Sequence, residues 1–264
     1  MSEEKGLSAC AALVRRHDPD RFLAALFAPA ARREALFTLY AFNHELARAR
    51  EVTREPTLAL IRLQWWREVV EGVRKRHEVA APLSDAIAQG LLVPEDLLGM
   101  IEGREAEAEP AIPDRAAWRA YLAATAGGVM AAAGRALGAE GAMLARLRVL
   151  GTAHGVAGQL RNVPALARAG RVLLPEDVLG AQGLSVHDVT AGQGEDRLRA
   201  VLAELAGEGR ALLGQAGGAM PRALVAAALP AVLARRDLAR EAPVAARGLG
   251  DRLAVLRAWV LGRV

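Results

Sequence analysis

Apolar side chains recur every three or four positions along most of this chain, which is the spacing of one face of an α-helix. One such stripe, between positions 31 and 50, is formed by Leu36, Leu39, Tyr40, Asn43 and Leu46. No stretch alternates between apolar and polar residues as a half-buried strand does. The pattern therefore predicts an all-α protein, with helices at Asp20–Phe27, Ala31–Arg50, from Pro56 onward, Pro94–Ala108, Asp114–Thr125, Val129–Gly138, Ala142–Arg161, Gln193–Gln215, Arg222–Arg236 and Ala246–Gly262.

Prolines and capping residues mark the predicted helix ends. The carboxylate of Asp114 can accept a hydrogen bond from a free N–H in the first turn of the helix that follows it. Pro164 is expected to end the preceding helix at Arg161, because proline disfavours helical geometry in the residue before it. The stretch from Pro164 to Gln193 has no periodic pattern. Since the chain contains no Pro/Ser-rich linker, low-complexity tail or internal repeat, we expect residues 1–264 to form one domain.

Composition supports the helical prediction and argues against a nucleic-acid partner. Hydrophobic residues make up 53% of the chain but aromatic residues only 4%, so most of the apolar mass is Ala, Leu and Val. Ala and Leu, like Arg and Glu, lose little side-chain freedom in a helix. The net charge of +4 comes almost entirely from arginines that are interleaved with acids. No basic block is accompanied by aromatic residues on which bases could stack.

The chain has few features of an exported or membrane-spanning protein. Cys10 is the only cysteine, which excludes a disulfide framework and a cysteine-based zinc site and fits a reducing compartment. The apolar stretch Gly6–Val14 follows two acids, whereas a signal peptide begins with basic residues. The longest uncharged stretches fall short of the ~20 apolar residues of a membrane span. We expect a cytoplasmic protein, and peripheral contact with the inner membrane remains open.

Four stretches stand out as candidates for function. Each has a simple structural explanation when it is taken alone, since aromatic stripes at helical spacing usually form core and glycines such as Gly127 and Gly151 allow helices to approach closely. The stretches are residues 27–43, residues 63–67, residues 121–130, and residues 155–162 with the later segment 170–179.

Taken together, in this order and spacing, the stretches resemble the squalene/phytoene synthase family over nearly the whole chain. The matching motifs are Leu39-Tyr40-Ala41-Phe42, Trp66-Arg67, Tyr121 with Gly127, Gln159-Leu160 with Asn162, and Gly170-Arg171 to Pro175. The resemblance implies an isoprenoid-synthase-like helical bundle around a central cavity, in which prenyl diphosphates are coupled head to head. It places these candidate ligand-binding residues at the cavity: Tyr40, Asn43, Arg48, Glu51, Tyr121, Gln159, Asn162 and Arg171.

The chain departs from the family pattern where the family holds magnesium. That chemistry needs two aspartate clusters, because Mg²⁺ prefers carboxylate oxygens and neutralises a diphosphate leaving group. The first position is Ala47-Arg48-Ala49-Arg50-Glu51, and the second, Val163 to Arg168, contains no acid. We therefore expect no metal, no cofactor and no catalytic residue, unless the chain is an active enzyme with another Mg²⁺ site.

The acids at 102, 105, 107 and 109 are interpreted as a solvated helix end. The five histidines show no ligand spacing, and His154 is expected to pack or to donate a hydrogen bond.

One branch of the superfamily lacks these aspartates and includes a mitochondrial complex I assembly factor. The segments Ala41–Leu46, Leu60–Trp66 and Leu160–Pro164 are similar to that branch. The similarity implies a non-catalytic assembly or chaperone-like factor for respiratory NADH:quinone oxidoreductase, with complex I subunits or assembly intermediates as partners. Two alternatives remain open: an active prenyl transferase of isoprenoid biosynthesis, and a carrier that binds an isoprenoid or quinone-like lipid.

Overall fold

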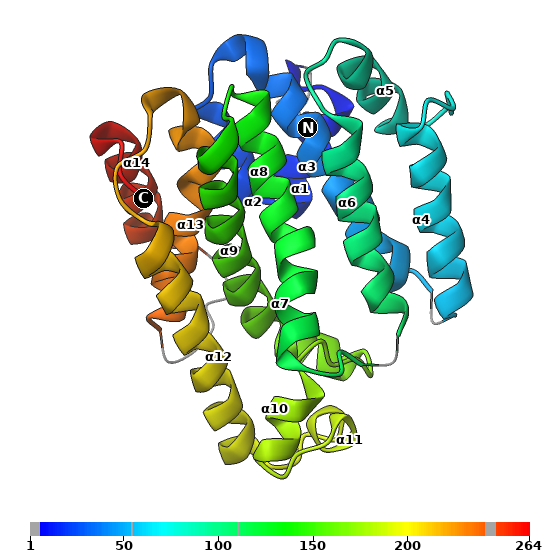
Figure 1. The fold of residues 1–264 in the computed structure, drawn as a ribbon, viewed down its shortest axis with the longest axis vertical. Helices are drawn as coiled ribbons and strands as arrows, with labels where there is room; N and C mark the ends of the chain where they lie inside the picture. Colours follow the sequence, from blue (N-terminus) through cyan, green and yellow to red (C-terminus); the bar gives the residue numbers. More distant parts are fainter. Residues whose placement is uncertain (1–5, 54, 110, 241–246) are drawn as a thin grey trace.

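The chain folds into a bundle of helices (Figure 1). The computed structural model describes residues 6–53, 55–109, 111–240 and 247–264. Its helices are α1 (Ala9–His17), α2 (Pro19–Leu26), α3 (Ala30–Glu51), α4 (Pro56–Val70), α5 (Ala80–Ala88), α6 (Pro94–Glu105), α7 (Arg115–Ala124), α8 (Ala126–Ala136), α9 (Gly141–Arg168), α10 (Glu176–Ala181), α11 (Val186–Thr190), α12 (Glu195–Ala216), α13 (Val225–Leu238) and α14 (Leu249–Leu261), with 3₁₀ turns at Ala106–Ala108 and Arg222–Leu224.

The longest described helix, α9, lies at the centre of the bundle and packs against α7, α8, α12 and α13 (Figure 1). Helices α3, α4 and α6 form a neighbouring group, with α4 at one edge of the molecule and α14 at the opposite edge. One continuous core joins the two groups and includes the fully buried side chains of Trp118, Tyr40 and Phe42. Within the described residues, the only β-type pairings are isolated bridges. The prediction of a single all-α bundle is thus confirmed.

Proline 164 does not end its helix, and this prediction was wrong. Helix α9 continues through Pro164 to Arg168. Pro164 is exposed, so the carbonyl one turn earlier, which loses its N–H partner, lies on the side of the helix that water reaches. The guanidinium of Arg168 donates a hydrogen bond of 3.1 Å to the carbonyl of Pro164, which supports the last turn.

Other differences from the prediction are local. Helices α1 and α5 were not predicted, although Ser8 caps α1 by accepting a hydrogen bond of 3.1 Å from the N–H of Ala11. The segment expected to be irregular contains the short helices α10 and α11. The apolar spacing of Leu60, Leu63, Trp66 and Val70 predicts that all four face the core, but Leu60 is exposed on α4. The predicted start of the last helix at Ala246 lies outside the described residues. None of the described helices is both long and apolar enough to cross a bilayer.

Candidate functional site

A cavity of about 1300 Å³ lies among α2, α3, α7, α9 and α14. Its wall combines apolar side chains and glycines of α9 with two groups of polar side chains. One group contains Glu107 and the other contains Asp18 and His154. Apolar side chains that line it include Leu122, Leu166, Leu173 and Leu233.

Glu107 is the centre of the first polar group. It lies in the 3₁₀ turn after α6, and its side chain is buried. The hydroxyl of Tyr121 donates a hydrogen bond of 2.7 Å to its carboxylate, and the guanidinium of Arg171 donates another of 3.3 Å. Arg104 forms a salt bridge with the same carboxylate and donates a hydrogen bond of 3.3 Å to the side-chain carbonyl of Asn43. Side chains of α6, of α7 and of the segment after α9 therefore converge on one acid, and Asn43 of α3 joins them through Arg104.

The surroundings of this group keep Glu107 ionised and Tyr121 neutral. Burial by itself raises the pKa of Glu107. The positive charge of Arg104 and the hydrogen bond from Tyr121 lower it by more, so the net shift is downward. Burial and the adjacent carboxylate raise the pKa of Tyr121, which keeps its hydroxyl protonated as a donor. A carboxylate engaged in this way has few lone pairs free for a metal ion.

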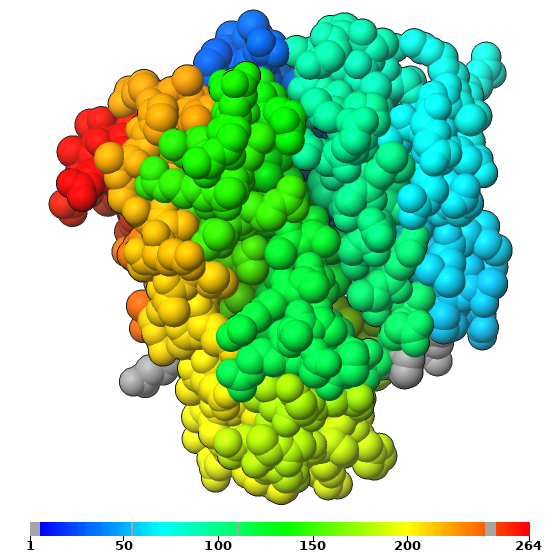
Figure 2. Space-filling view, in the orientation of Figure 1, coloured from blue at the N-terminus to red at the C-terminus, as the bar shows by residue number. Residues whose placement is uncertain are grey.

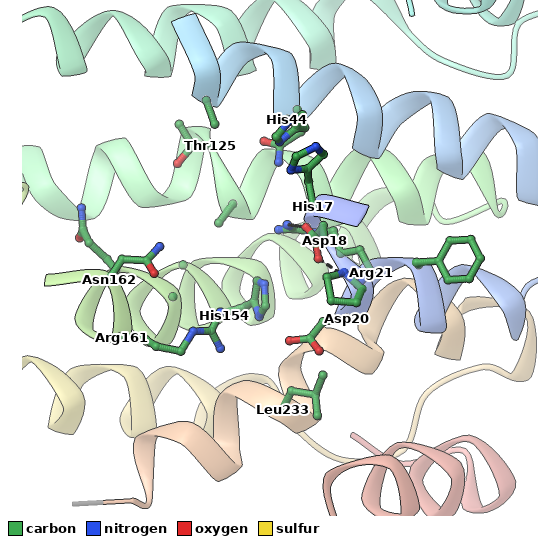
Figure 3. A pocket seen from close by; sticks show the side chains of 18 of the residues that line it. His17, Asp18, Asp20, Arg21, His44, Thr125, His154, Arg161, Asn162 and Leu233 are labelled. Carbon is green, nitrogen blue, oxygen red and sulfur yellow. Dashed lines mark hydrogen bonds and ion pairs between the residues drawn. The ribbon is translucent and has the colours of Figure 1, made fainter. Parts of the chain in front are cut away.

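The second polar group brings together three histidines that are far apart in the sequence. Figure 3 shows His17 and His44 beside one another, and His154 projecting from α9 on the side of Asp18 and Arg21. The rings of His17 and His44 are stacked with their centroids 4.3 Å apart. Packing of α1 on α3 thus brings together two histidines that share no local spacing in the sequence, and it does so as a stacked pair of rings.

His154 is held neutral by its surroundings. Burial, followed by the positive charge of Arg21, lowers the pKa of His154 to about 3. Asp18 and Arg21 form a salt bridge of 2.6 Å at the start of α2. Burial raises the pKa of Asp18, but the charge of Arg21 and its hydrogen bonds outweigh burial and lower it overall. Nδ1 of His154 is buried and has no hydrogen-bond partner among the described residues.

Six of the eight candidate residues line this cavity, and two lie elsewhere. The cavity wall includes Asn43, Glu51, Tyr121, Gln159, Asn162 and Arg171. Tyr40 is buried in the core beside the wall, with the guanidinium of Arg21 5.8 Å from its ring centroid. Arg48 lies on the exposed side of α3 and forms a salt bridge of 3.1 Å with Glu45, because the helix turns it away from the cavity.

Gln159 of α9 is a buried polar residue of the cavity wall. Its side-chain carbonyl accepts a hydrogen bond from the indole N–H of Trp118, and this bond fixes the orientation of the amide. The amide nitrogen is buried and has no partner among the described residues. The wall therefore presents one unsatisfied donor from α9.

Comparison with known proteins identifies the family. The sequence model described as squalene/phytoene synthase matches residues 14–258. The chain belongs to the squalene/phytoene synthase family. A dehydrosqualene synthase structure with a bound ligand superposes with a TM-score of 0.76 at 18% identity, covering 95% of this chain and 94% of that one. Squalene synthase from Alicyclobacillus acidocaldarius gives a TM-score of 0.67 at 20% identity, covering 96% and 92%. These structures share the fold.

Several proteins that are similar in sequence are named as assembly factors and not as synthases. The human protein called NADH dehydrogenase (ubiquinone) complex I, assembly factor 6 is 27% identical over 205 residues, which are 75% of this chain and 62% of the human protein. The mouse protein of the same name is 28% identical over 235 residues, or 85% and 69% of the two chains. The chain spans 62% of the first of these relatives, so it matches only part of that protein.

The two positions where the family resemblance expects aspartate clusters are poorly suited to magnesium. On α3, Ala47 lines the cavity and Ala49 is buried, while Arg50 donates a hydrogen bond of 3.2 Å to the backbone carbonyl of Glu107. On α9, Val163 is buried and no acid follows it before the helix ends. Among the described residues, no group of three or more His, Cys, Asp and Glu side chains could hold a metal ion.

The acidic run after α6 was interpreted wrongly as a solvated helix end. Glu102 and Glu109 are exposed as expected, but Glu107 is the buried acid of the site and Glu105 forms a salt bridge of 2.7 Å with Arg67 of α4. The spacing of Arg104 and Glu107 is the signal that could have found this acid, because residues three apart on a helix face one another. In this arrangement the buried carboxylate of Glu107 is already neutralised by Arg104 and Arg171.

Proposed function

We propose that this chain is a non-catalytic assembly or chaperone-like factor for respiratory NADH:quinone oxidoreductase, complex I. The observation that carries the proposal is the state of Glu107: the buried carboxylate of a synthase-like cavity is shared by two arginines and a tyrosine hydroxyl, and is thus engaged by protein groups. The names of the similar curated proteins support the same role. Its partners would be complex I subunits or assembly intermediates.

The absence of catalysis is part of this proposal. Ionising a prenyl diphosphate requires metal ions to neutralise the leaving group, and the wall offers Ala47 where a carboxylate would be needed. Purified protein is incubated with labelled farnesyl or geranylgeranyl diphosphate and Mg²⁺. We expect no product above a heat-denatured control. A rate of order 0.01 s⁻¹ or more would instead establish the prenyl transferase, since enzymes typically reach ~1–10³ s⁻¹.

Deletion of the gene in its host tests the assembly role. We expect a loss of assembled complex I on native gels and a matching loss of NADH:quinone activity in membranes, both restored by the wild-type gene. The activity of another respiratory complex in the same membranes serves as the control. Normal complex I together with altered carotenoid or hopanoid content would contradict the proposal and favour a role in isoprenoid biosynthesis.

A second candidate function is the binding of an isoprenoid or quinone-like lipid. The specific observation in its favour is a cavity of about 1300 Å³ whose lining includes leucines and an unsatisfied amide donor, that of Gln159. A quinone carbonyl could accept that hydrogen bond while its tail lies along the leucines. Extraction of the protein purified from its host and mass spectrometry of the lipids would reveal such a ligand. Lipid recovered equally from a Gln159→Leu variant would exclude this contact.

A further inference from the structure

Helix α14 presents an apolar surface to the outside of the molecule. Figure 2 shows this helix in red at one edge of the protein, on the opposite side from α4. Five of its large apolar side chains are between 44% and 79% exposed: Leu249, Leu253, Leu256, Val260 and Leu261. Contiguous exposed apolar surface is uncommon on proteins and marks sites of interaction.

The exposed side chains form a narrow stripe. With each residue turning about 100° around the helix axis, Leu249, Leu253, Leu256 and Val260 fall within a sector of about 60°. The buried residues of the helix, which include Val255 and Ala258, lie on roughly the opposite side and pack toward α13. The helix is therefore apolar on both its inner and its outer face, and only the inner face has a partner in the described fold.

The charges beside this stripe are all positive. Arg252 and Arg257 lie about 40° beyond its two edges, and Arg263 follows the helix. None of these three arginines forms a salt bridge with any acid that the structure describes. The only acid between 249 and 264 is Asp251, which is buried and paired with Arg236 and Arg240 at 2.6 Å.

A fourth arginine stands at the C-terminal end of the same surface. The guanidinium of Arg222 lies 4.1 Å from the ring centroid of Trp259 and donates a hydrogen bond of 2.8 Å to the carbonyl of the same residue. Trp259 is partly buried against the core and packs on Phe27 of the connection after α2. A tryptophan and arginines beside exposed leucines are the combination found where a helix lies at a lipid surface.

We propose that α14 lies in the surface of an anionic lipid bilayer, with its leucine stripe among the acyl chains and its arginines on the lipid phosphates. The helix has 13 residues, too few for the ~20 of a membrane span, so it lies parallel to the surface. Positive charge on both edges of the stripe favours an anionic surface over a second copy of this chain, because a second copy would bring the same arginines together.

An exposed apolar segment on α4 differs in its charges. On α4, Leu58, Leu60 and Ile61 are exposed. The charges near them have both signs: Arg62, Arg67 and Glu68 lie in the helix, and Glu55 precedes it. This segment provides a matched control, since Leu58 and Ile61 are 49% and 58% exposed while Leu253 and Val260 are 63% and 57% exposed.

The test is co-sedimentation of the full chain with vesicles. Phosphatidylcholine vesicles with about 30% phosphatidylglycerol should bind the wild type at least about tenfold more tightly than phosphatidylcholine alone, and about 0.5 M NaCl should reduce the difference. The double variant Leu253→Glu/Val260→Glu should lose at least about tenfold in affinity for the anionic vesicles. Leu58→Glu/Ile61→Glu on α4 adds the same charge and should bind as the wild type does.

The folding of both variants is checked by circular dichroism, and their thermal midpoints should stay within about 2 °C of the wild type because the replaced side chains are exposed. Equal binding of the wild type to neutral and anionic vesicles would overturn the proposal. An equal loss in the α4 variant would overturn it as well. So would a wild-type dimer in solution that only the α14 variant disrupts, since the stripe would then be covered by a second copy.

Discussion

Glu107 is deeply buried and surrounded by charged and polar partners. Removing this acid should cost more stability than the intact group contributes. Two guanidinium groups and a phenol surround the carboxylate, and the side chains of Arg104 and Arg171 are each only 15% exposed. Such a group contributes little net stability when intact, because desolvation of the charges offsets their attraction. Removal of the acid alone, however, leaves buried positive charge without compensation.

Glu107→Gln should therefore lower the free energy of unfolding by about 2–5 kcal/mol. The amide still accepts a hydrogen bond from Tyr121, so the cost comes from the lost charge and not from lost shape. Urea unfolding followed by circular dichroism measures the change. The matched control is Glu102→Gln on the exposed side of α6, which should stay within about 0.5 kcal/mol. A Glu107→Gln protein as stable as this control would contradict the buried network.

His154 should make the protein less stable as the pH falls below neutrality. The native state keeps its pKa at about 3, whereas an unfolded histidine titrates near ~6.5. Between these values the unfolded chain binds a proton that the native state does not, so the contribution is complete above ~6.5 and falls by at most about 1.4 kcal/mol for each pH unit below it. The same direction holds for His44, whose pKa burial and His17 lower.

The variant His154→Gln removes this titration, and its free energy of unfolding should fall less steeply between about pH 6.5 and pH 5 than that of the wild type. Measurement requires urea unfolding at several pH values. His187→Gln on the exposed side of α11 is the control and should keep the wild-type slope. If both variants keep that slope, His154 is not held neutral in the native state.

At the residue scale, the sequence pointed to some members of the site and missed others for a physical reason. Asn43, Tyr121 and Arg171 could be found because each stands in a recognisable motif. Glu107 could not, because a run of acids looks like a solvated surface until the packing of α6 against α7 encloses one of them. The pairing of His17 with His44 has no sequence signature at all, since it depends on how α1 lies on α3.

Helices α8 and α9 approach so closely that Gly127 and Gly151 have no room for side chains. A Cβ atom on Gly151 would lie 2.6 Å from the carbonyl oxygen of Ala126 and 2.7 Å from Cβ of Met130. A Cβ atom on Gly127 would lie 2.8 Å from the hydroxyl of Thr152. The interpretation of these glycines as close-packing positions is confirmed for this contact. It does not hold for Gly158, where nothing lies within 4 Å of the added atom.

Replacing glycine by alanine at these two positions of α9 should thus change the stability of the protein in opposite directions. Gly151→Ala should destabilise the protein by about 1–3 kcal/mol, because backbone atoms of α8 cannot move aside cheaply. Gly158→Ala should stabilise it by up to about 1 kcal/mol, since alanine has the better helix propensity and meets no neighbour there. Thermal unfolding of the two proteins beside the wild type measures both. A stabilising Gly151→Ala would mean that the two helices are further apart than described.

At the element scale, long periodic helices were predictable and their interruptions were not. The stripe of α3 and the apolar periodicity of α12 and α13 gave these helices within a few residues of their observed bounds. The helix end predicted at Pro164 was wrong because a proline on the exposed face of a long, well-packed helix costs less free energy than ending the helix. Helices α1 and α5 have nine residues each, too few for a clear periodic pattern.

The ends of the described chain are joined through a network of buried ion pairs. Arg247, just before α14, forms salt bridges of 2.8 Å with Asp20 of α2 and with Asp237 of α13. Asp237 also accepts a hydrogen bond of 2.8 Å from Arg161 of the central helix α9. Segments separated by more than two hundred positions are thus connected through two carboxylates, which indicates that the N-terminal and C-terminal parts fold together.

The whole chain should therefore unfold as one domain. Trp66, Trp118 and Trp259 lie in α4, α7 and α14, so tryptophan fluorescence reports on three distant parts while circular dichroism reports on all helices. The two urea transitions should coincide.

Asp237→Asn should shift both transitions together by about 2–4 kcal/mol, because it leaves Arg161 and Arg247 with less negative charge in a partly buried place. Asp196→Asn on the exposed start of α12 should change stability by no more than about 0.5 kcal/mol. Transitions that separate in the Asp237→Asn protein would mean that the C-terminal helices form a unit of their own, held to the rest by this network.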